Sequence, residues 1–167
     1  MAERYDTEQE LEFYRKYWSE AYGQTGQFGI YLLKARELSL QKVMPAVEKT
    51  GLSTAEFDAL TTLRRSAPPH QATPTELQRS MLITSGGLTK ILYQLEEKGL
   101  VSRSTNEQDK RVKYVNLTSK GKSLVEKTIQ AVHQLQEQWL EGALTKNETD
   151  KLIQLLGKSI KFLEGEI

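Results

Sequence analysis

The residues of this chain best suited to bind an anion lie together in one short stretch, TSGGLTK, at positions 84–90. Hydroxyl and ammonium side chains flank two adjacent glycines, Gly86 and Gly87, at the point where a regular amphipathic pattern begins. The start of a helix presents free backbone N–H groups and the positive end of the helix dipole, and both attract phosphate. Because glycine has no side chain, a phosphate or a base edge could approach this backbone closely.

A second interpretation of the two glycines is a loose helix start that packs tightly on the preceding helix. Glycine costs a helix about 1 kcal/mol relative to alanine, so either interpretation needs a reason for both residues. The charge of the surrounding chain favours nucleic acid. Residues 78–127 carry 10 basic and 5 acidic side chains, whereas residues 1–77 and 128–167 each have a net charge of −2. Such a local excess of cations is typical of a site for a polyanion.

The stretch after the glycines predicts a helix over residues 85–98 that ends at Gly99. At 100° per residue, its core face carries Leu88, Ile91, Leu92 and Leu95, and its opposite face is small or polar. The N-terminal residues of such a helix can enter the major groove of DNA and bond bases or phosphates. The DNA contacts expected here are Thr84 as N-cap, Ser85, Gly86, Gly87, Thr89, Lys90 and Tyr93.

A basic hairpin is expected directly after this helix, because the apolar period changes from 3.6 to 2. Two strands, at 101–104 and 112–117, surround a polar turn at 105–111 that carries Asp109, Lys110 and Arg111. An arginine on a projecting hairpin can insert into the minor groove, and Asp109 could hold the turn or orient that arginine. The alternative is an ordinary solvated turn. The expected DNA contacts of the hairpin are Arg103, Asp109, Lys110 and Arg111.

The elements that position these residues are mostly helical. Three capping boxes mark helix starts, at Ser53–Glu56, Thr73–Glu76 and Thr145–Glu148. A short helix is expected at 74–81 after a loop at 67–71. An N-terminal helical region should break near 23–26, and Pro45 should bend it or thin its hydrogen bonding. The predicted fold class is mostly α with a small two- to three-stranded β-wing: a winged helix-turn-helix lobe plus a helical dimerisation region.

The last helix carries a regular apolar stripe, with spacings of 3, 4, 3 and 4 residues. This alternation is typical of a helix that packs on another helix. The partner helix could belong to the same chain or to a second copy across a two-fold axis, and the sequence leaves both open. The residues of the stripe are Ile153, Leu156, Ile160, Leu163 and Ile167, of which the first four are the expected dimerisation residues.

Several classes of function are disfavoured by composition. The chain has no cysteine and only two histidines, His70 and His133, so cysteine chemistry is excluded and we expect no metal site and no catalytic residues. It also lacks a phosphate-cradling glycine loop, a nucleophile elbow and an HExxH helix, so we expect no enzyme and no cofactor. No apolar run is long enough to cross a bilayer and the N-terminus has no signal-peptide pattern, so a cytoplasmic protein without membrane contact is expected.

The stretch from Thr73 to Gly121 resembles the MarR family of bacterial transcription regulators. TPTELQRSMLITSGGLTKILYQLEEKGLV is similar to that family's third helix and recognition helix, and RSTNEQDKRVKYVNLTSKG to its wing. The wing signature is a D-x-x-D-x-R turn and a strand that ends in LT-x-x-G. The residues that match it are Asp109, Arg111, Leu117, Thr118 and Gly121, whereas Asn106 stands where the family often has aspartate.

The resemblance implies a homodimer whose interlocked terminal helices carry two winged lobes on a pseudo-palindromic DNA operator, most often as a repressor. The corresponding regions are 1–50 for N-terminal dimerisation, 51–120 for DNA binding and 121–167 for C-terminal dimerisation. It also implies release by a small organic effector bound between the dimerisation helices and the lobe. Residues that could line such a pocket are Trp18, Tyr22, Tyr31 and His70, although the aromatic residues could equally form dimer core and His70 an exposed loop position.

The sequence therefore predicts a sequence-specific, double-stranded DNA-binding transcription regulator that acts as a ligand-responsive homodimer. The alternative is a winged-helix module that binds protein and not DNA, since the fold alone does not fix the function. A protein-binding version would not need Lys90, Arg111 or the local excess of positive charge.

Overall fold

The computed structural model describes residues 6–81, 83–106 and 108–165. The chain divides into two compact units, residues 1–43 and residues 44–167, and each is considered by itself. In the described part of the chain, none of the helices has the length and apolar character that a bilayer span needs.

The N-terminal unit is helical and has the predicted break. Helix α1 (Thr7–Tyr17) is followed by a 3₁₀ turn at Ser19–Ala21, and α2 (Gln24–Glu48) begins within the predicted window at 23–26 and continues into the second unit. Within the N-terminal unit, Lys34 Nζ of α2 lies 3.1 Å from Glu10 Oε2 of α1, an ion pair that joins the two helices. The predicted break is therefore confirmed. Pro45 lies inside α2, and its expected effect on that helix stays a prediction.

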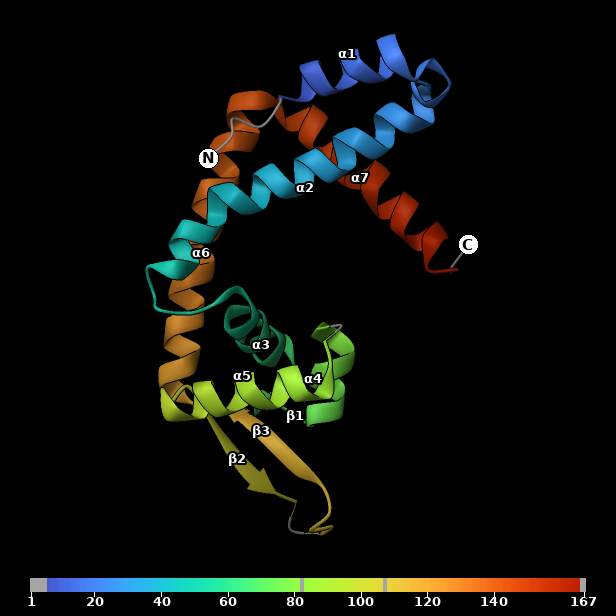
Figure 1. Ribbon diagram of the computed structural model, residues 1–167. Coiled ribbons are helices and arrows are strands. Elements are labelled where there is room, and N and C mark those ends of the chain that lie inside the picture. The colour runs from blue at the N-terminus through green and yellow to red at the C-terminus, as the bar shows by residue number, and fades with distance from the viewer. Residues whose placement is uncertain (1–5, 82, 107, 166–167) are drawn as a thin grey trace. The chain divides into compact units, whose positions relative to one another are not determined.

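The second unit contains the end of α2, five further helices and a small sheet (Figure 1). Its elements are α3 (Thr54–Arg65), β1 (Gln71–Ala72), α4 (Pro74–Met81), α5 (Ser85–Glu97), β2 (Val101–Thr105), β3 (Lys113–Leu117), α6 (Ser119–Ala143) and α7 (Lys146–Leu163). The sheet is antiparallel with strand order β1-β3-β2, and Arg103 of β2 is opposite Val115 of β3. This arrangement confirms the predicted fold class, with β1 as the third strand.

The predicted helix starts are confirmed by their hydrogen bonds. In each of the three capping boxes, the glutamate carboxylate accepts from the backbone N–H of the serine or threonine, at 2.7 to 2.8 Å. Each of these reciprocal pairs satisfies two backbone donors that the first helical turn leaves free. The same bonds stabilise the charged carboxylates, and the pKa of both Glu76 and Glu148 is lowered by hydrogen bonds from Thr73 and Thr145 respectively.

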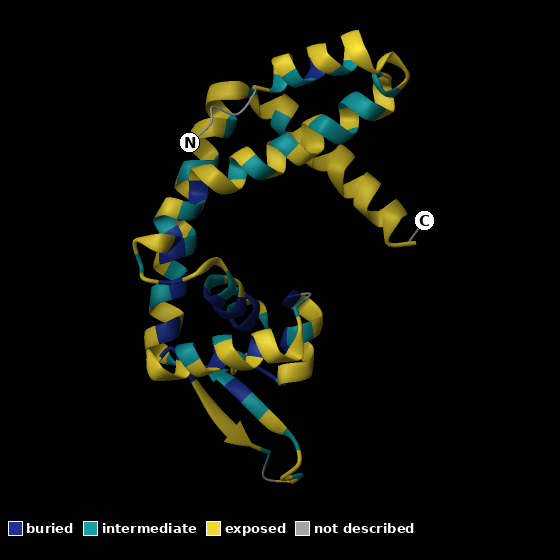
Figure 2. Ribbon diagram, viewed as in Figure 1, coloured by how far each residue is buried: buried dark blue, intermediate teal, exposed yellow. Residues whose placement is uncertain are grey.

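The core of the winged lobe is aliphatic. Its fully buried large side chains come from six elements and are Val47, Leu60, Leu63, Leu77, Leu95, Val115 and Val125. Burial of each such side chain contributes roughly 1.5–3 kcal/mol, so the core fixes the positions of α3, α4 and α5 relative to β3 (Figure 2). Leu95 belongs to the predicted core face of α5, as do the buried Leu88 and Leu92.

Helix α6 begins where β3 ends, and a glycine makes this junction possible. Thr118 is the N-cap, and its hydroxyl accepts from the Gly121 N–H at 3.0 Å. A Cβ atom on Gly121 would overlap the carbonyl oxygen of Leu100. The LT-x-x-G pattern therefore combines a helix cap with a position where only glycine lets α6 approach the chain after α5.

Helix α7 has no buried residue in its described part. Its apolar stripe is exposed in a single copy of the chain, with Ile153 63%, Leu156 39%, Ile160 52% and Leu163 82% accessible to solvent. Ile167, the last residue of the predicted stripe, lies outside the described residues. Figure 2 shows α7 exposed along its length.

Candidate nucleic-acid interface

The start of α5 has the cap that the sequence predicted. Thr84 is the N-cap, and its hydroxyl oxygen accepts from the Gly87 N–H at 3.2 Å. The hydroxyl of Thr89 donates to the carbonyl of Ser85 at 3.0 Å. From Thr84 to Thr89, every residue except the buried Leu88 is exposed. The first turn of α5 therefore presents small polar residues and backbone donors to solvent.

Gly86 separates the two interpretations of the double glycine. A Cβ atom at Gly86 would meet no described atom within 4 Å, so this glycine is not needed for packing on the preceding helix. At Gly87, a Cβ atom would lie 3.2 Å from the Thr84 hydroxyl, tight against the cap. Gly87 thus has a local role in the cap, whereas the space over Gly86 is open to an external group.

The rest of the outer face of α5 is polar and exposed, as the helical wheel predicts. Lys90 and Tyr93 are both exposed, and Glu97 follows Tyr93 one turn further along the helix. A hydrogen bond with the Glu97 side chain and the negative charge of Glu97 raise the pKa of Tyr93. Tyr93 is 58% exposed.

The tip of the β2–β3 hairpin is held by two acceptor side chains. Asn106 Oδ1 accepts from the Gln108 N–H at 2.8 Å and the Asp109 N–H at 3.3 Å. Asp109 Oδ1 accepts from the backbone N–H of Arg111 at 3.0 Å and from its Nε at 3.3 Å. Asp109 therefore both holds the turn and orients the arginine, the two roles that the sequence suggested. Asn106 still shapes the turn where the family often has aspartate.

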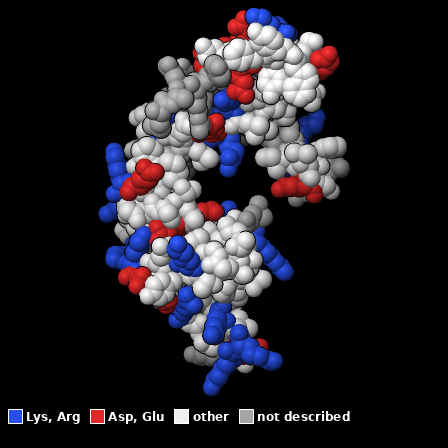
Figure 3. All heavy atoms as spheres, viewed as in Figure 1, with Lys and Arg blue, Asp and Glu red and all other residues white. Residues whose placement is uncertain are grey.

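Positive charge gathers at the free end of this hairpin (Figure 3). The side chain of Arg111 is 94% exposed although it is paired with Asp109. Lys110 and Lys113 are exposed on either side of it. Arg111 is therefore directed into solvent by its local hydrogen bonds, the geometry that a minor-groove contact requires.

Two hollows lie between these elements. One, of about 270 Å³, is lined by residues of α4, the start of α5 and β2, and it includes Ser85, Thr89 and Arg103. The other, of about 400 Å³, lies between Thr73–Thr75 at the start of α4 and Arg111–Lys113 of the wing. Thr75 and Lys113 were not among the sequence-predicted contacts, because nothing in a linear pattern shows that the start of α4 faces the wing.

Arg103 is placed beside α5 by an ion pair. Its Nε lies 3.1 Å from Glu96 Oε2, which connects β2 to the last turn of the preceding helix. Together with the first hollow, this contact shows that the sequence-predicted residues of the α5 start and of the hairpin base lie in one region of the lobe. Arg103 is nevertheless held by a neighbouring acid, so part of its charge is compensated within the chain.

The residues suggested for an effector pocket fall in different units. Trp18, Tyr22 and Tyr31 belong to the N-terminal unit, where Trp18 stacks on Tyr14 with ring centroids 5.9 Å apart. His70 belongs to the second unit, with a positive φ of 61° and Nδ1 2.9 Å from the Ser66 carbonyl oxygen. The pocket therefore stays a prediction.

A buried helical core, a helix with an open, polar start and a cationic β-hairpin define a winged helix-turn-helix protein. The family model of the MarR family matches residues 52–113, which extend from just before α3 to the first residue of β3. The chain is also 32% identical over 115 residues to the HTH-type transcriptional regulator PecS of Dickeya dadantii, an alignment that covers 69% of each protein. The chain belongs to the MarR family of transcriptional regulators.

Solved structures show the same architecture. MarR of E. coli, as a cysteine-to-serine variant complexed with operator DNA, is 30% identical with a TM-score of 0.66, over 78% of this chain and 91% of that one. NadR in complex with 4-hydroxyphenylacetate is 25% identical with a TM-score of 0.64, over 80% of this chain and 92% of that one. The fold is thus shared along most of the chain and not only within the winged lobe.

Proposed function

We propose that this protein binds double-stranded DNA sequence-specifically and regulates transcription as a homodimer. The single observation that carries the proposal is the open backbone at Gly86, at the exposed start of a helix that a cationic hairpin accompanies. Nothing described within the chain occupies this space, and its chemistry suits a phosphate or a base edge. The relative of known structure that was solved with operator DNA supports the same conclusion.

In the proposed complex, the start of α5 enters the major groove. Ser85, Thr89 and Lys90 supply hydroxyl and ammonium donors to base edges and phosphates. The missing side chain at Gly86 lets the helix start approach the duplex, while the backbone N–H groups and the helix dipole favour the negative charge there. Tyr93, one turn further on, presents an exposed aromatic side chain to the same groove.

The wing makes the second contact. Arg111, oriented by Asp109, reaches into the minor groove beside the recognition site, where the negative potential of a narrow groove attracts a guanidinium. The hollow between Thr73–Thr75 and Arg111–Lys113 suits a backbone phosphate, with hydroxyl and cationic groups on opposite sides. Such phosphate contacts set orientation and affinity, whereas the α5 contacts read sequence.

Dimerisation is supported by the exposed stripe of α7. Four apolar side chains at helical spacing are between 39% and 82% exposed, and no described residue of α7 is buried. Contiguous apolar surface of this kind is typical of a surface that another helix covers. A two-fold axis would place two α5 helices on successive major grooves, about one helical turn apart, and would require a pseudo-palindromic operator.

Release by a small organic effector and repression of the controlled genes complete the proposal. The exposed aromatic residues Trp18 and Tyr31 could stack on such an effector. NadR, a structural relative, was solved with the phenolic acid 4-hydroxyphenylacetate, which supports an aromatic carboxylate as the chemical class. A second copy of the chain could cover the same residues instead, so they are to be tested in the dimer.

The test is selection of bound sequences from a random double-stranded DNA pool at two salt concentrations. The expected result is an inverted repeat with half-sites about one turn apart, bound with an affinity that falls steeply with salt. Sedimentation of the free and DNA-bound protein measures the oligomeric state. No enrichment at either salt, with protein first dialysed and refolded to remove effector, would favour the protein-binding alternative.

A further inference from the structure

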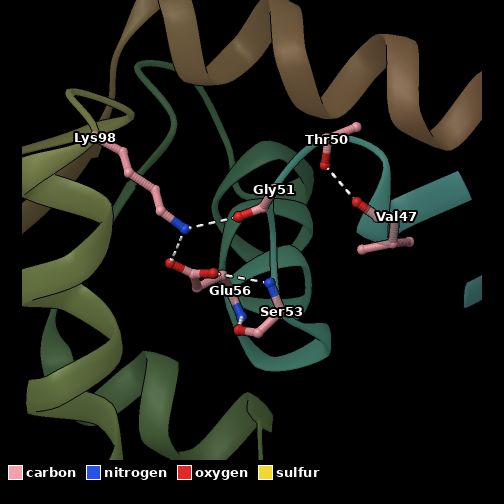
Figure 4. A network of polar contacts seen from close by, with 6 residues as sticks. All are labelled: Val47, Thr50, Gly51, Ser53, Glu56 and Lys98. Carbon is pink, nitrogen blue, oxygen red and sulfur yellow. Dashed lines mark hydrogen bonds and ion pairs between the residues drawn. The ribbon is translucent and has the colours of Figure 1, made fainter. Parts of the chain in front are cut away.

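The charged residue Glu56 is buried at the start of α3. Its side chain is only 4% exposed, and both of its carboxylate oxygens are used. Oε2 accepts from the backbone N–H of Ser53 at 2.8 Å, and Oε1 lies 2.6 Å from the ammonium of Lys98 (Figure 4). A buried carboxylate needs such partners, because an unpaired charge in the interior is strongly destabilising.

Lys98 is the C-cap of α5, so this ion pair joins α3 to the end of the recognition helix. The same ammonium donates to the carbonyl of Gly51 at 2.9 Å, in the turn that follows α2. The turn itself is closed by the hydroxyl of Thr50, which donates to the carbonyl of Val47 at 2.6 Å. Lys98 therefore connects the end of α5 to both the end of α2 and the start of α3.

The backbone of Lys98 is held from the other side by α6. Its carbonyl accepts from the ammonium of Lys120 at 2.7 Å. The next two carbonyls, of Gly99 and Leu100, accept from the hydroxyl of Thr118 at 2.9 and 3.0 Å. The ends of α2 and α5 and the start of α6 thus meet at Lys98. We name the contacts of Lys98 with Gly51 and Glu56 the Lys98 clamp.

From this arrangement we infer that Lys98 and Glu56 are positioning residues for DNA recognition, an inference that rests on the proposed DNA-binding function. Helix α5 has 13 residues and is therefore about 20 Å long. Because a helix moves as a rigid rod, a tilt of about 5° about its C-terminal end would move its DNA-facing start by about 2 Å. Hydrogen bonds to base edges tolerate far less than this displacement. The clamp would hold the end of α5 in place and would thereby fix the position of its DNA-facing start.

The sign of the effect on binding separates positioning from simple electrostatics. Glu56→Gln removes a negative charge, which by charge alone would tighten binding to a polyanion. The positioning role predicts the opposite, a loss of at least fivefold in affinity for the selected operator. Lys98→Met is expected to lose at least tenfold, with an unchanged salt dependence because Lys98 does not neutralise a phosphate.

The control is a second ion pair whose cation is as exposed as Lys98, at 40% against 39%, although its carboxylate is not buried as Glu56 is. Arg64 Nε of α3 lies 2.7 Å from Glu126 Oε1 of α6, and this pair does not include α5. Arg64→Met should therefore leave affinity within twofold of wild type. Because the clamp acts as a unit, the double variant Glu56→Gln/Lys98→Met should bind no more weakly than Lys98→Met alone. All affinities are measured at a temperature where circular dichroism shows each variant folded.

A second readout does not require DNA. The backbone N–H groups of Lys98, Gly99 and Leu100 donate to carbonyls in the last turn of α5. Their hydrogen exchange should be at least tenfold faster in Lys98→Met than in Arg64→Met. Unchanged exchange would overturn the inference, as would unchanged operator affinity in Glu56→Gln and Lys98→Met or an equal loss in Arg64→Met. If the wild-type protein selects no DNA at all, the proposed function fails, and the exchange measurement alone then decides whether Lys98 holds the end of α5.

Discussion

Arg103 Nε of strand β2 lies 3.1 Å from Glu96 Oε2 in the last turn of α5, so the wing and the recognition helix are joined by an ion pair. Both side chains are more than two-fifths exposed, and exposed pairs of this kind contribute only about 0–1 kcal/mol to stability. The pair therefore matters less for the fold than for the surface charge of the lobe, because Glu96 compensates part of the charge of Arg103 on the proposed DNA-binding face.

Arg103→Met is expected to weaken DNA binding about equally for different sequences and to reduce the salt slope by about 1, because a phosphate-contacting cation is lost. Glu96→Gln should strengthen binding and increase the salt slope, since it removes the acid that is paired with Arg103. Fluorescence anisotropy with the selected operator and with a scrambled duplex measures both. A loss confined to the operator would assign Arg103 to base recognition and contradict this prediction.

Arg111→Ala is expected to weaken operator binding by roughly 1–3 kcal/mol and to leave the fold unchanged. The fold should tolerate the change because the Arg111 side chain is 94% exposed and its ion pair is with Asp109 of its own turn. Asp109→Ala should give a smaller loss, since the guanidinium remains but is no longer oriented. Binding titrations with circular dichroism as the check on folding test both variants, and an unchanged affinity in Arg111→Ala would exclude the wing from the mechanism.

Substitutions at Gly86 should change stability and DNA binding in opposite directions. Gly86→Ala is expected to stabilise the free protein by about 0.4–1 kcal/mol, because the helix gains a better helix former and the added methyl meets no described atom. The same variant should bind the operator more weakly, and the larger Gly86→Val should abolish specific binding. Urea unfolding and anisotropy titrations provide the two measurements.

Gly142→Ala is the matched control for this pair of measurements. Gly142 also lies in a helix, α6, and a Cβ atom there meets no described atom within 4 Å. Its substitution should raise stability with no effect on operator affinity. If Gly86→Val binds the operator normally, the explanation of the open backbone at the start of α5 is wrong.

Much of the second unit could be predicted from sequence because its signals are local. A capping box such as Ser53–Glu56 depends on residues three apart, and the buried face of α5 follows from a helical period, so both were confirmed in detail. The position of strand β1 was not predicted. Its residues Gln71 and Ala72 pair with residues of β3, Asn116 and Val115, that lie more than 40 positions later in the chain. No local pattern encodes such a pairing.

The Lys98 clamp could not be predicted from local sequence patterns for the same reason. Glu56 was identified as a capping residue, but its burial and its contact with Lys98, 42 residues later, come from tertiary packing. Lys98 itself reads in sequence as an ordinary cation near a helix end. By contrast, the contact between Asp109 and Arg111 could be predicted, since those two residues lie within one turn.

Gly121→Ala is expected to destabilise the protein by about 1–3 kcal/mol, because the new methyl overlaps the Leu100 carbonyl and forces α6 away from the end of α5. Urea unfolding measures the loss against Gly142→Ala, which adds the same methyl to the same helix in open space. Stability equal to that of Gly142→Ala would mean that the α6 start moves without cost, and that the close approach at Leu100 is not required.

The contribution of Glu56 to stability should depend on pH. Burial of its carboxylate acts to raise the pKa, but the hydrogen bonds from Lys98 and Ser53 outweigh burial and hold the pKa below the ordinary value of 4.5. Between the folded and unfolded pKa values, the folded state therefore binds fewer protons than the unfolded state. The stabilisation is then fully present above about pH 4.5 and is lost as the pH falls through the folded pKa.

The measurement is the difference in unfolding free energy between wild type and Glu56→Gln, from urea titrations at several pH values between 3 and 7. This difference should be constant near neutral pH and should shrink progressively below about pH 4.5. Other carboxylates titrate in the same range, including Asp58, whose pKa is raised by burial, but they are common to both proteins and cancel in the difference. A difference that grows as the pH falls would mean that burial, and not the Lys98 ammonium, governs the ionisation of Glu56.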